Sequence, residues 1–495
     1  MNADQLPGNW LLTNLGAAVD YGKTFKAEPG EIPAQTWVLE LEDIEKDTSR
    51  IVARLTQDER QSKSTKNRFD TGDVLYGKLR PYLNKVVIAD APGCCTTEII
   101  PLKAGAQLDN RYLFYWLRHP DFLAYVEAES HGLNMPRLGT EMGKAAPFVL
   151  APRNEQTRIA DKLDAVLARV DACRDRLDRI PTILKRFRQS VLAAATSGKL
   201  TEGWRQECGA RVTPDEVIAE RRLRAKKDNE RRALESFLTD YASVSADGHG
   251  LPTTWVVTNV GSIGVVSNGS TPSRQVETYW GGDIPWVSSG EVRNTVISST
   301  RERISTDGYE NSSVRMLPKG TVLIAMIGEG KTRGQSALLN IEGCINQNIA
   351  AVIPVESLMK SKYLWYWFQG QYENNRVFGN GTGPQALNCQ RVRELPVNLP
   401  PLQEQTEIVR RIESLFAFAD RLEARHAAAR AQVENLTPAT LAKAFRGELV
   451  PQDPNDEPAS ALLKRIRAQR DDPAANNSRR GRQGPQAKKF EAIPC

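Results

Sequence analysis

A glycine-rich loop in the second half of the chain has residue types that could bind phosphate. Residues 328–332 read Gly-Glu-Gly-Lys-Thr and follow a strand-like run, as in the phosphate-binding loop of nucleotide-binding enzymes. That loop needs a glycine five residues before Gly330 for its tight turn, and Ala325 stands there. Residues 333–336 (Arg-Gly-Gln-Ser) do not begin a convincing helix. A nucleotide-binding enzyme that uses the Gly328–Thr332 loop is therefore the weaker interpretation.

The same loop has the Glu-x-Lys spacing of metal-dependent nucleases, at Glu329 and Lys331. Nothing else in the sequence supports a metal site. The four histidines and seven cysteines are scattered, and no Cys-x-x-Cys pair occurs. That pattern argues against zinc and for a reducing cytoplasm. We predict no metal site and a cytoplasmic location.

A glycine-rich, basic turn that approaches DNA explains this loop better. Lys331 and Arg333 would contact phosphates or guanine, and Gln335 could reach an adenine edge. The alternative for each residue is an ordinary solvated surface group. An early segment has a comparable basic set: Lys78, Arg80 and Lys85, with Tyr82 and Asn84 between them.

These loops need a scaffold, and the sequence contains one stretch that occurs twice. The first copy begins at Asn154 and the second at Gln403. Glu155 aligns with Glu404, and Gly198 aligns with Gly447, both at an offset of 249 residues. A repeat without gaps indicates that both copies have the same structural role.

Both copies have the apolar spacing of a helix that packs along a partner helix. A large apolar side chain gains about 1.5–3 kcal/mol on burial, so each seam needs a partner, and the other copy is the nearest one available. A helix packed on a globular core is the alternative. The expected seam consists of Ile159, Leu163, Val166, Val170, Cys173, Leu177, Ile180, Leu184, Phe187 and Val191 in the first copy, and Ile408, Ile412, Leu415, Ala419, Leu422, His426, Ala429, Val433 and Leu436 in the second.

Prolines and glycines predict where these helices begin, bend and end. An interior proline costs a helix about 3 kcal/mol, so we expect a kink at Pro181 or a new helix that starts there. Thr437-Pro438 is a helix-start signal and predicts a restart in the second copy. Gly198 and Gly447 are natural helix ends.

The segments before the two helical copies also resemble each other. The two segments begin with similar sequences, Leu6-Pro7-Gly8-Asn9-Trp10 and Leu251-Pro252-Thr253-Thr254-Trp255. Their β-like runs alternate with Gly-, Ser- and Pro-rich loops, which predicts a mixed α/β fold. Each has one aromatic helical segment, around residues 110–127 and 361–376. These two halves have diverged more than the helices.

Length and composition agree with a multidomain globular protein. The chain has 495 residues, is 40% hydrophobic and has a net charge of +6, which is compatible with nucleic acid as a partner. No run of 18 apolar residues predicts a membrane helix, and the N-terminus does not resemble a signal peptide. Residues 214–238 are strongly charged and predicted to be helical, either as a solvated helix or as a contact for DNA phosphates or a partner subunit. The last 25 residues or so are expected to be disordered.

Several motifs together resemble the specificity subunit of type I restriction–modification enzymes. They occur in the family's order over nearly the whole chain: Lys78–Lys85, Leu184–Ala195, Gly198–Thr201, Pro285–Glu291, Asn346–Ile349, Leu399–Gln405 and Asp456–Leu463. Ser288 and Arg293, in or beside one of these motifs, join the candidate DNA contacts.

The resemblance implies two target recognition domains separated by two long helical regions, which pack as an antiparallel coiled coil with pseudo-two-fold symmetry. It implies the following domains: recognition domain 1 (1–151), central helical region (152–204), charged helical linker (205–249), recognition domain 2 (250–400), distal helical region (401–450), and a short helix with a disordered basic tail (451–495). Each recognition domain would read one half of a split, asymmetric double-stranded DNA target.

The resemblance also implies partners that carry the chemistry. Two modification subunits would supply adenine methylation with S-adenosylmethionine, and restriction subunits would supply translocation and cleavage with ATP and Mg²⁺. The present chain would have no catalytic residue and no cofactor. An adenine methyltransferase loop needs Asn/Asp-Pro-Pro-aromatic, and the only near match, Asn398-Leu399-Pro400-Pro401, enters a helix instead. A coiled-coil scaffold without nucleic acid is a further alternative.

The expected geometry suits two readers on one duplex. Half-sites one helical turn apart are separated by about 34 Å, and a helix of 40 residues spans about 60 Å. The helices would then set the number of unread base pairs between the half-sites.

Overall fold

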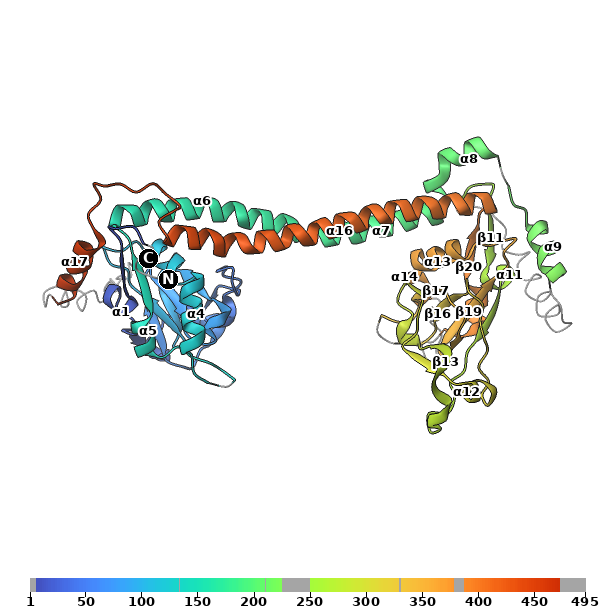
Figure 1. The fold of residues 1–495 in the computed structure, drawn as a ribbon, viewed down its shortest axis with the longest axis horizontal. Helices are drawn as coiled ribbons and strands as arrows, with labels where there is room; N and C mark the ends of the chain where they lie inside the picture. The colour runs from blue at the N-terminus through green and yellow to red at the C-terminus, as the bar shows by residue number, and fades with distance from the viewer. Residues whose placement is uncertain are drawn as a thin grey trace, which may run out of the picture. The chain divides into compact units, whose positions relative to one another are not determined.

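The computed structural model describes residues 6–132, 134–209, 211–224, 250–328, 331–377 and 387–471 (Figure 1). The chain forms two compact units. Unit 1 consists of Met1–Asp178 and Ala427–Cys495, and unit 2 consists of Arg179–His426. Glu329, Gly330, residues 225–238 of the predicted charged helix and the C-terminal tail lie outside the described residues.

Unit 1 contains a mixed α/β part followed by helices. Its strands are β1 (Leu11–Asn14), β2 (Phe25–Ala27), β3 (Trp37–Leu39), β4 (Leu55–Thr56), β5 (Lys66–Phe69), β6 (Val74–Gly77), β7 (Val86–Ile88), β8 (Gly93–Thr96), β9 (Ile99–Leu102) and β10 (Pro147–Leu150). Its helices are α1 (Leu15–Ala18), α2 (Gln57–Arg60), α3 (Asn110–Trp116), α4 (Pro120–Glu129), α5 (Thr140–Ala145), α6 (Arg153–Leu177) and α17 (Ala459–Asp471), with short 3₁₀ turns η2 (Pro29–Glu31), η3 (Leu41–Asp43) and η4 (Pro81–Leu83).

Unit 2 repeats this plan with longer strands. Its strands are β11 (Val256–Asn259), β12 (Gly264–Asn268), β13 (Trp280–Val287), β14 (Thr295–Ile297), β15 (Glu302–Ile304), β16 (Val322–Ala325), β17 (Ser336–Leu339), β18 (Cys344–Ile345), β19 (Ile349–Pro354) and β20 (Pro396–Leu399). Its helices are α7 (Ile180–Thr196), α8 (Glu202–Cys208), α9 (Pro214–Arg224), α11 (Val260–Ile263), α12 (Thr306–Glu310), α13 (Ser361–Gly370), α14 (Tyr372–Val377) and α15 (Cys389–Glu394), with 3₁₀ turns η5 (Lys199–Thr201), η6 (Glu277–Tyr279) and η7 (Ser289–Glu291). Helix α16 (Leu402–Phe445) has residues in both units.

The sheets of the two units correspond strand by strand at two places. In unit 1 the first and last strands form the pair β1–β10, and in unit 2 they form the pair β11–β20. Both pairs are antiparallel and in the same register, since Leu11 faces Leu150 and Val256 faces Leu399. The order β7-β6-β9 in unit 1 matches β17-β16-β19 within the five-stranded sheet of unit 2. The mixed α/β fold predicted for both halves is confirmed.

The aromatic helical segments supply the core of each unit, as expected. Tyr112 and Trp116 of α3 are fully buried, and so are Tyr363 and Phe368 of α13. Each segment consists of two helices rather than one. In unit 1 the break between α3 and α4 falls at Pro120, which starts the second helix.

Pro181 and the glycines Gly198 and Gly447 correctly predict where the long helices begin and end. Pro438 does not. Pro181 lies in the first turn of α7, so α6 and α7 are separate helices, as expected. Gly198 and Gly447 have φ values of 80° and 76° just beyond helix ends. The restart expected at Thr437-Pro438 was wrong, because α16 runs through Pro438 without a break. Pro438 is exposed and has no amide hydrogen, so α16 lacks one backbone hydrogen bond there.

The helices run antiparallel within each unit. In unit 2, Arg188 of α7 contacts Asp420 and Glu423 of α16 at 2.6 and 2.9 Å, and the Arg411 guanidinium donates to the Leu200 carbonyl at 2.7 Å. In unit 1, Asp178, which follows α6, pairs with Arg430 of α16. Figure 1 shows α6 and α16 side by side. Residue numbers along α16 therefore fall as those of the contacting first-copy segments rise, which means that the helices are antiparallel.

Most expected seam residues are buried or half-buried. Ile159, Leu163, Val170, Leu184, Val191, Ile408, Ile412, Ala419 and Val433 are buried, and Val166, Leu177, Ile180, Phe187, Leu415, Leu422, His426 and Ala429 are half-buried. Cys173 and Leu436 are exposed, so the expectation was wrong at these two positions. Leu167, which lies outside the predicted spacing, is buried instead. Among the described residues, no helix is long and apolar enough to cross a membrane.

Candidate nucleic-acid interface

The hairpin loop between β6 and β7 contains the residues of unit 1 that were predicted to contact DNA. Arg80 is exposed and Tyr82 is 53% exposed. Strand β6 is the middle strand of its sheet and is fully buried, so it gives the loop a rigid base. The loop tip is the 3₁₀ turn η4, in which Pro81 is buried, Leu83 is half-buried and Tyr82 faces solvent.

Neighbouring backbone holds this loop in an unusual conformation. Arg80 and Asn84 flank the turn with φ values of 48° and 49°, in the left-handed region that is rare for residues other than glycine. The Arg80 amide donates to the Pro136 carbonyl at 2.7 Å, and the Leu138 amide donates to the Lys78 carbonyl at 3.0 Å. These bonds over-determine the turn, which is how a strained backbone persists at functional sites.

The equivalent loop of unit 2 joins β16 to β17. It contains the glycine-rich segment from the sequence, and Lys331 is exposed there. The Gly334 amide donates to the Ala325 carbonyl, and the Gln335 amide donates to the Thr332 carbonyl. Glu329 and Gly330 of the predicted phosphate-binding loop lie outside the described residues.

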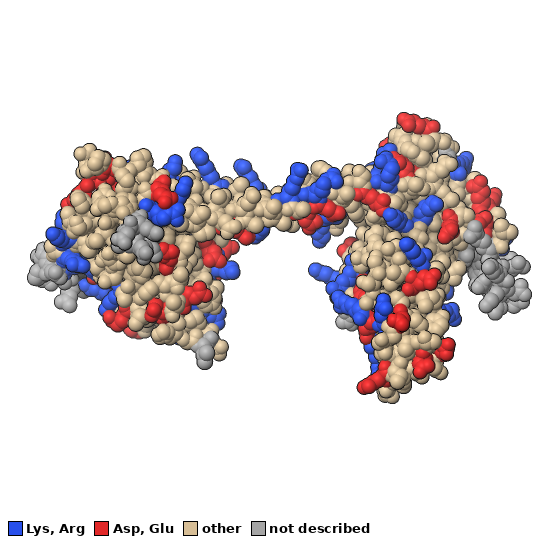
Figure 2. All heavy atoms as spheres, viewed as in Figure 1, with Lys and Arg blue, Asp and Glu red and all other residues tan. Residues whose placement is uncertain are grey.

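Helix α14 supports the unit 2 loop from one side. The Tyr372 hydroxyl donates to the Lys331 carbonyl at 2.6 Å, and Arg376 donates to that hydroxyl at 2.7 Å. Figure 2 shows Lys and Arg side chains gathered on the flank of unit 2 where Figure 1 places α14. The loop therefore lies on a basic flank, which suits a phosphate backbone.

Arg293 lies beside the same loop. The neighbouring Asn294 amide donates to the Ser336 carbonyl at 2.7 Å, and the Ser336 amide donates back to the Asn294 side chain. Arg293 is exposed. The fold thus brings Arg293, Gln335 and Lys331 to one edge of the sheet, although they are up to 42 residues apart.

Other predicted contacts are engaged inside the protein. The Lys85 amine donates to the Leu41 carbonyl at 2.7 Å. Ser288 donates to Glu291 at 3.0 Å and closes a capping box at η7. Arg333 is only 7% exposed, so it faces the loop interior rather than solvent. Lys78 is half-buried. In this conformation Arg80, Tyr82, Arg293 and Lys331 are the accessible members of the predicted set.

Sequence reasoning missed one neighbour of the unit 1 loop. Met135 is 45% exposed and directly precedes Pro136, whose carbonyl accepts from Arg80. Local sequence gives no signal for this contact, because residues 131–137 are far along the chain from residues 78–85. The isolated bridge between Leu79 and Arg137 brings them together.

A buried hydrogen bond anchors each unit to a repeat helix. The Trp10 indole donates to the Glu155 carboxylate and the Trp255 indole donates to Glu404, both at 2.8 Å. Burial raises the pKa of Glu155, and the bonds from Trp10 and Gln452 oppose that shift. Glu404 also accepts from Thr201 and Arg205. These residues are structural anchors and lie away from the hairpin loops.

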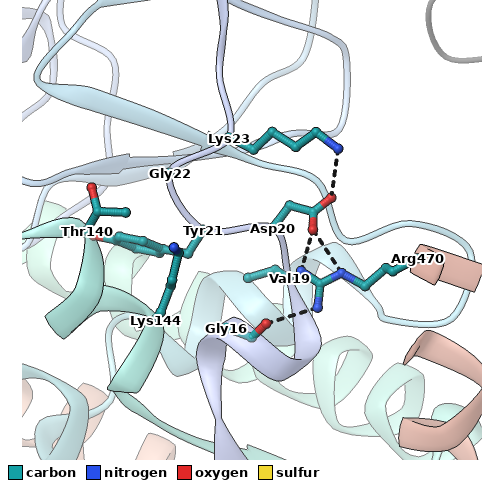
Figure 3. Close-up of a pocket in the computed structure, with 9 residues that line it drawn as sticks. All are labelled: Gly16, Val19, Asp20, Tyr21, Gly22, Lys23, Thr140, Lys144 and Arg470. Carbon is teal, nitrogen blue, oxygen red and sulfur yellow. Dashed lines mark hydrogen bonds and ion pairs between the residues drawn. The ribbon is translucent and has the colours of Figure 1, made fainter. Parts of the chain in front are cut away.

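A hollow of about 340 Å³ in unit 1 lies between α1, α5 and α17 (Figure 3). The cationic side chains that line this hollow already have hydrogen-bond or ion-pair partners. Arg470 donates to Asp20 at 2.9 Å and to the Gly16 carbonyl at 2.9 Å, and Lys144 pairs with Glu141 at 2.9 Å. The hollow is therefore a joint that fixes α17 to α1 rather than a ligand site. The described residues contain no cluster of three His, Cys, Asp or Glu side chains suited to a metal ion.

Comparisons with known proteins agree with this architecture. Residues 252–429 match the family model described as type I restriction modification DNA specificity domain. The chain is 31% identical to the StySPI specificity subunit of Salmonella potsdam, over 73% of this chain and 72% of that protein. It is 31% identical to the EcoKI specificity subunit of Escherichia coli strain K12, over 70% and 68%, and 29% identical to the EcoBI specificity subunit of Escherichia coli, over 78% and 77%.

Solved structures share the fold at lower identity. The crystal structure of the HsdS subunit from Thermoanaerobacter tengcongensis has a TM-score of 0.56 at 19% identity, covering 90% of this chain and 98% of that one. A chain from a study of assembly and conformational transition of the type I R-M system has a TM-score of 0.62 at 19% identity, covering 90% and 99%. With two mixed α/β units, long repeat helices and these relatives, the chain belongs to the specificity subunits of type I restriction enzymes.

Proposed function

We propose that this chain reads DNA for a type I restriction–modification complex, with one recognition domain for each half of a bipartite, asymmetric target. The observation that carries this proposal is the equivalence of the two hairpin loops. Both follow the middle strand of a β7-β6-β9 type arrangement, and both present an exposed cation, Arg80 or Lys331. Equivalent positions with different residues suit two readers of different half-site sequences.

We further propose that the repeat helices form an antiparallel coiled-coil spacer with pseudo-two-fold symmetry. The antiparallel contacts inside each unit support this. So does the repeated anchor, in which Gly198 packs on Pro252 and Gly447 packs on Pro7. Each globular part is thus closed by the end of the other copy's helical region. The spacer would fix how many unread base pairs separate the half-sites.

The specificity subunit is the non-catalytic part of such a complex. We propose that two modification subunits dock on it and methylate adenine with S-adenosylmethionine, and that restriction subunits bring ATP, Mg²⁺ and cleavage. No cofactor is proposed for this chain itself. We propose the cytoplasm as its compartment, in keeping with the cysteines of the described residues, which are all free.

Domain exchange tests the bipartite assignment. Residues 1–151 are replaced by the first recognition domain of another specificity subunit, and the hybrid is expressed with its modification subunits. Methylated-adenine mapping should show a new sequence in one half of the target and an unchanged second half. A change in both halves, or in neither, contradicts modular reading.

The dependence of DNA affinity on salt concentration tests whether the β16–β17 hairpin contacts DNA. Lys331→Ala should weaken binding and lower the slope of log affinity against log salt by about 1, because one phosphate contact is lost. Lys319→Ala is the matched control, since Lys319 is exposed near the other end of β16. An identical slope for wild type and Lys331→Ala would show that this hairpin is not part of the DNA interface.

A further inference from the structure

Each of the two equivalent hairpins exposes a large apolar side chain and a cation within the same loop. In unit 1 it is Tyr82, which is 53% exposed, and in unit 2 it is Ile327, which is 49% exposed. Arg80 lies two residues before Tyr82, and Lys331 lies four residues after Ile327. The two loops share no sequence pattern, so the feature they have in common does not come from a sequence repeat that stayed unchanged in both halves.

The two side chains lie in equivalent connections of the fold, five residues beyond the end of β6 for Tyr82 and two residues beyond the end of β16 for Ile327. Tyr82 lies in the connection that leaves β6 and Ile327 in the connection that leaves β16. Both strands are paired antiparallel on both sides, with β7 and β9 or with β17 and β19. Both loops therefore leave the same edge of equivalent sheets.

Backbone hydrogen bonds hold the described residues of both loops. The Asn84 amide donates to the Pro81 carbonyl at 2.9 Å, and the Arg80 amide is bound to Pro136. On the unit 2 side, the Met326 amide donates to the Asn348 carbonyl at 2.9 Å, and Met326 accepts from Leu387. The unit 1 loop is preformed and loses little conformational entropy on binding, so Tyr82 is already positioned to insert. In unit 2, the bonds of Met326 hold the residue directly before Ile327.

The positive charge near these apolar side chains indicates that their binding partner is DNA. An apolar side chain flanked by exposed arginine or lysine matches a base-pair stack bordered by phosphates. A protein partner would be met better by an apolar patch with a mixed polar rim. Met135, 45% exposed beside the residue that binds Arg80, adds apolar surface to the unit 1 tip.

We propose that Tyr82 and Ile327 are wedges, each inserting between adjacent base pairs of its own half-site and kinking the duplex there. This inference rests on the proposed DNA-reading role of the hairpins and adds a mechanism to it. Inserted apolar side chains unstack a base step and bend DNA by roughly 20–90°. Each half-site would then favour a flexible pyrimidine–purine step at the wedge, which contributes specificity without a hydrogen bond to a base edge.

The test uses the full chain with its modification subunits on the duplex identified by methylated-adenine mapping. The duplex carries fluorophores at its ends, so that energy transfer reports the bend. Tyr82→Ala and Ile327→Ala should each reduce the bend and weaken binding about ten-fold, and the double variant should remove most of the bend. Tyr82→Phe and Ile327→Leu should keep both. Val52→Ala, at a 62% exposed apolar position outside the hairpin, is the control.

The possible results separate the wedge from the wider proposal. An unbent wild-type complex, or alanine variants with the wild-type bend, would overturn the wedges while sequence-specific binding stands. Alanine variants that no longer assemble with the modification subunits, seen by native mass spectrometry, would show that the tips bind protein and would also overturn them. If the wild-type complex does not bind the mapped target in preference to other DNA, the proposed function itself fails.

Discussion

The indole Nε1 of Trp10 lies 2.8 Å from Oε2 of Glu155, although the two residues are 145 positions apart. Trp255 and Glu404 repeat this bond at the same distance across 149 positions. The next residue in each helix, Gln156 or Gln405, uses its side chain to bind backbone on both sides of the junction. This pair of anchors fixes where each long helix leaves its globular part.

The first prediction concerns the strength of these anchors. Trp10→Phe removes one donor to Glu155, and among the described residues the remaining side-chain donor is the Gln452 amide, at 2.5 Å. A buried acceptor that loses its donor costs about 1–3 kcal/mol. Hydrogen exchange should show faster opening of the β1–β10 pair, with little change in β11–β20. Trp255→Phe should cost less, because Glu404 keeps Thr201 and Arg205. Equal losses in the two units would contradict the role of these extra partners.

The second prediction concerns the glycine beyond α16. A Cβ at Gly447 would lie 2.4 Å from Cγ of Pro7, and its φ is 76°. Gly447→Ala should therefore destabilise unit 1 by about 1–3 kcal/mol, measured as a lower denaturation midpoint. Gly203→Ala is the matched control. Gly203 lies in α8 with no atom within 4 Å of its added Cβ, so alanine there should be neutral or stabilise by up to about 1 kcal/mol.

The third prediction concerns His119 and acid. Burial lowers the pKa of His119 from 6.5 to about 4, and its ring stacks on Trp116 with centroids 5.0 Å apart. A lowered histidine pKa means that the folded state resists protonation. Its stabilisation is complete above pH 6.5 and is lost as the pH falls from 6.5 toward 4, by about 3 kcal/mol at most.

Thermal melts at several pH values check this effect. His119→Asn keeps an acceptor for the Asp121 amide at the start of α4 but cannot titrate, so its melting temperature should fall less between pH 6.5 and 4. His131→Asn, at an exposed position, is the control for loss of a histidine. An unchanged acid sensitivity in His119→Asn would assign the transition to other groups.

The fourth prediction concerns Pro438. Helix α16 passes through this residue, which is exposed and lacks the amide for one backbone bond. Pro438→Ala should restore that bond and stabilise the helix by up to about 3 kcal/mol. Urea denaturation followed by circular dichroism at the helical band measures it. A destabilised variant would mean that the packing of α16 depends on the geometry that proline imposes.

Several features followed from the sequence because their causes are local along the chain. The 249-residue offset aligned Glu155 with Glu404 and Gly198 with Gly447, and both pairs occupy equivalent structural positions. Heptad spacing identified most buried helix positions, since periodicity reports one face of a helix. Pro181 was placed correctly because a proline fixes the first turn wherever a helix can start.

Tertiary structure alone decided what each side chain meets. Arg333 is buried and Lys85 binds the Leu41 carbonyl, although both have the residue type of a DNA contact. Thr437-Pro438 has a start signal, but packing along α16 outweighs the local cost. Burial and hydrogen bonding depend on segments that arrive from elsewhere in the chain. The sequence by itself therefore determined the repeat, the helices and the family. Only the fold determined which of the basic residues reach solvent and that equivalent loops of both units expose an apolar side chain and a cation.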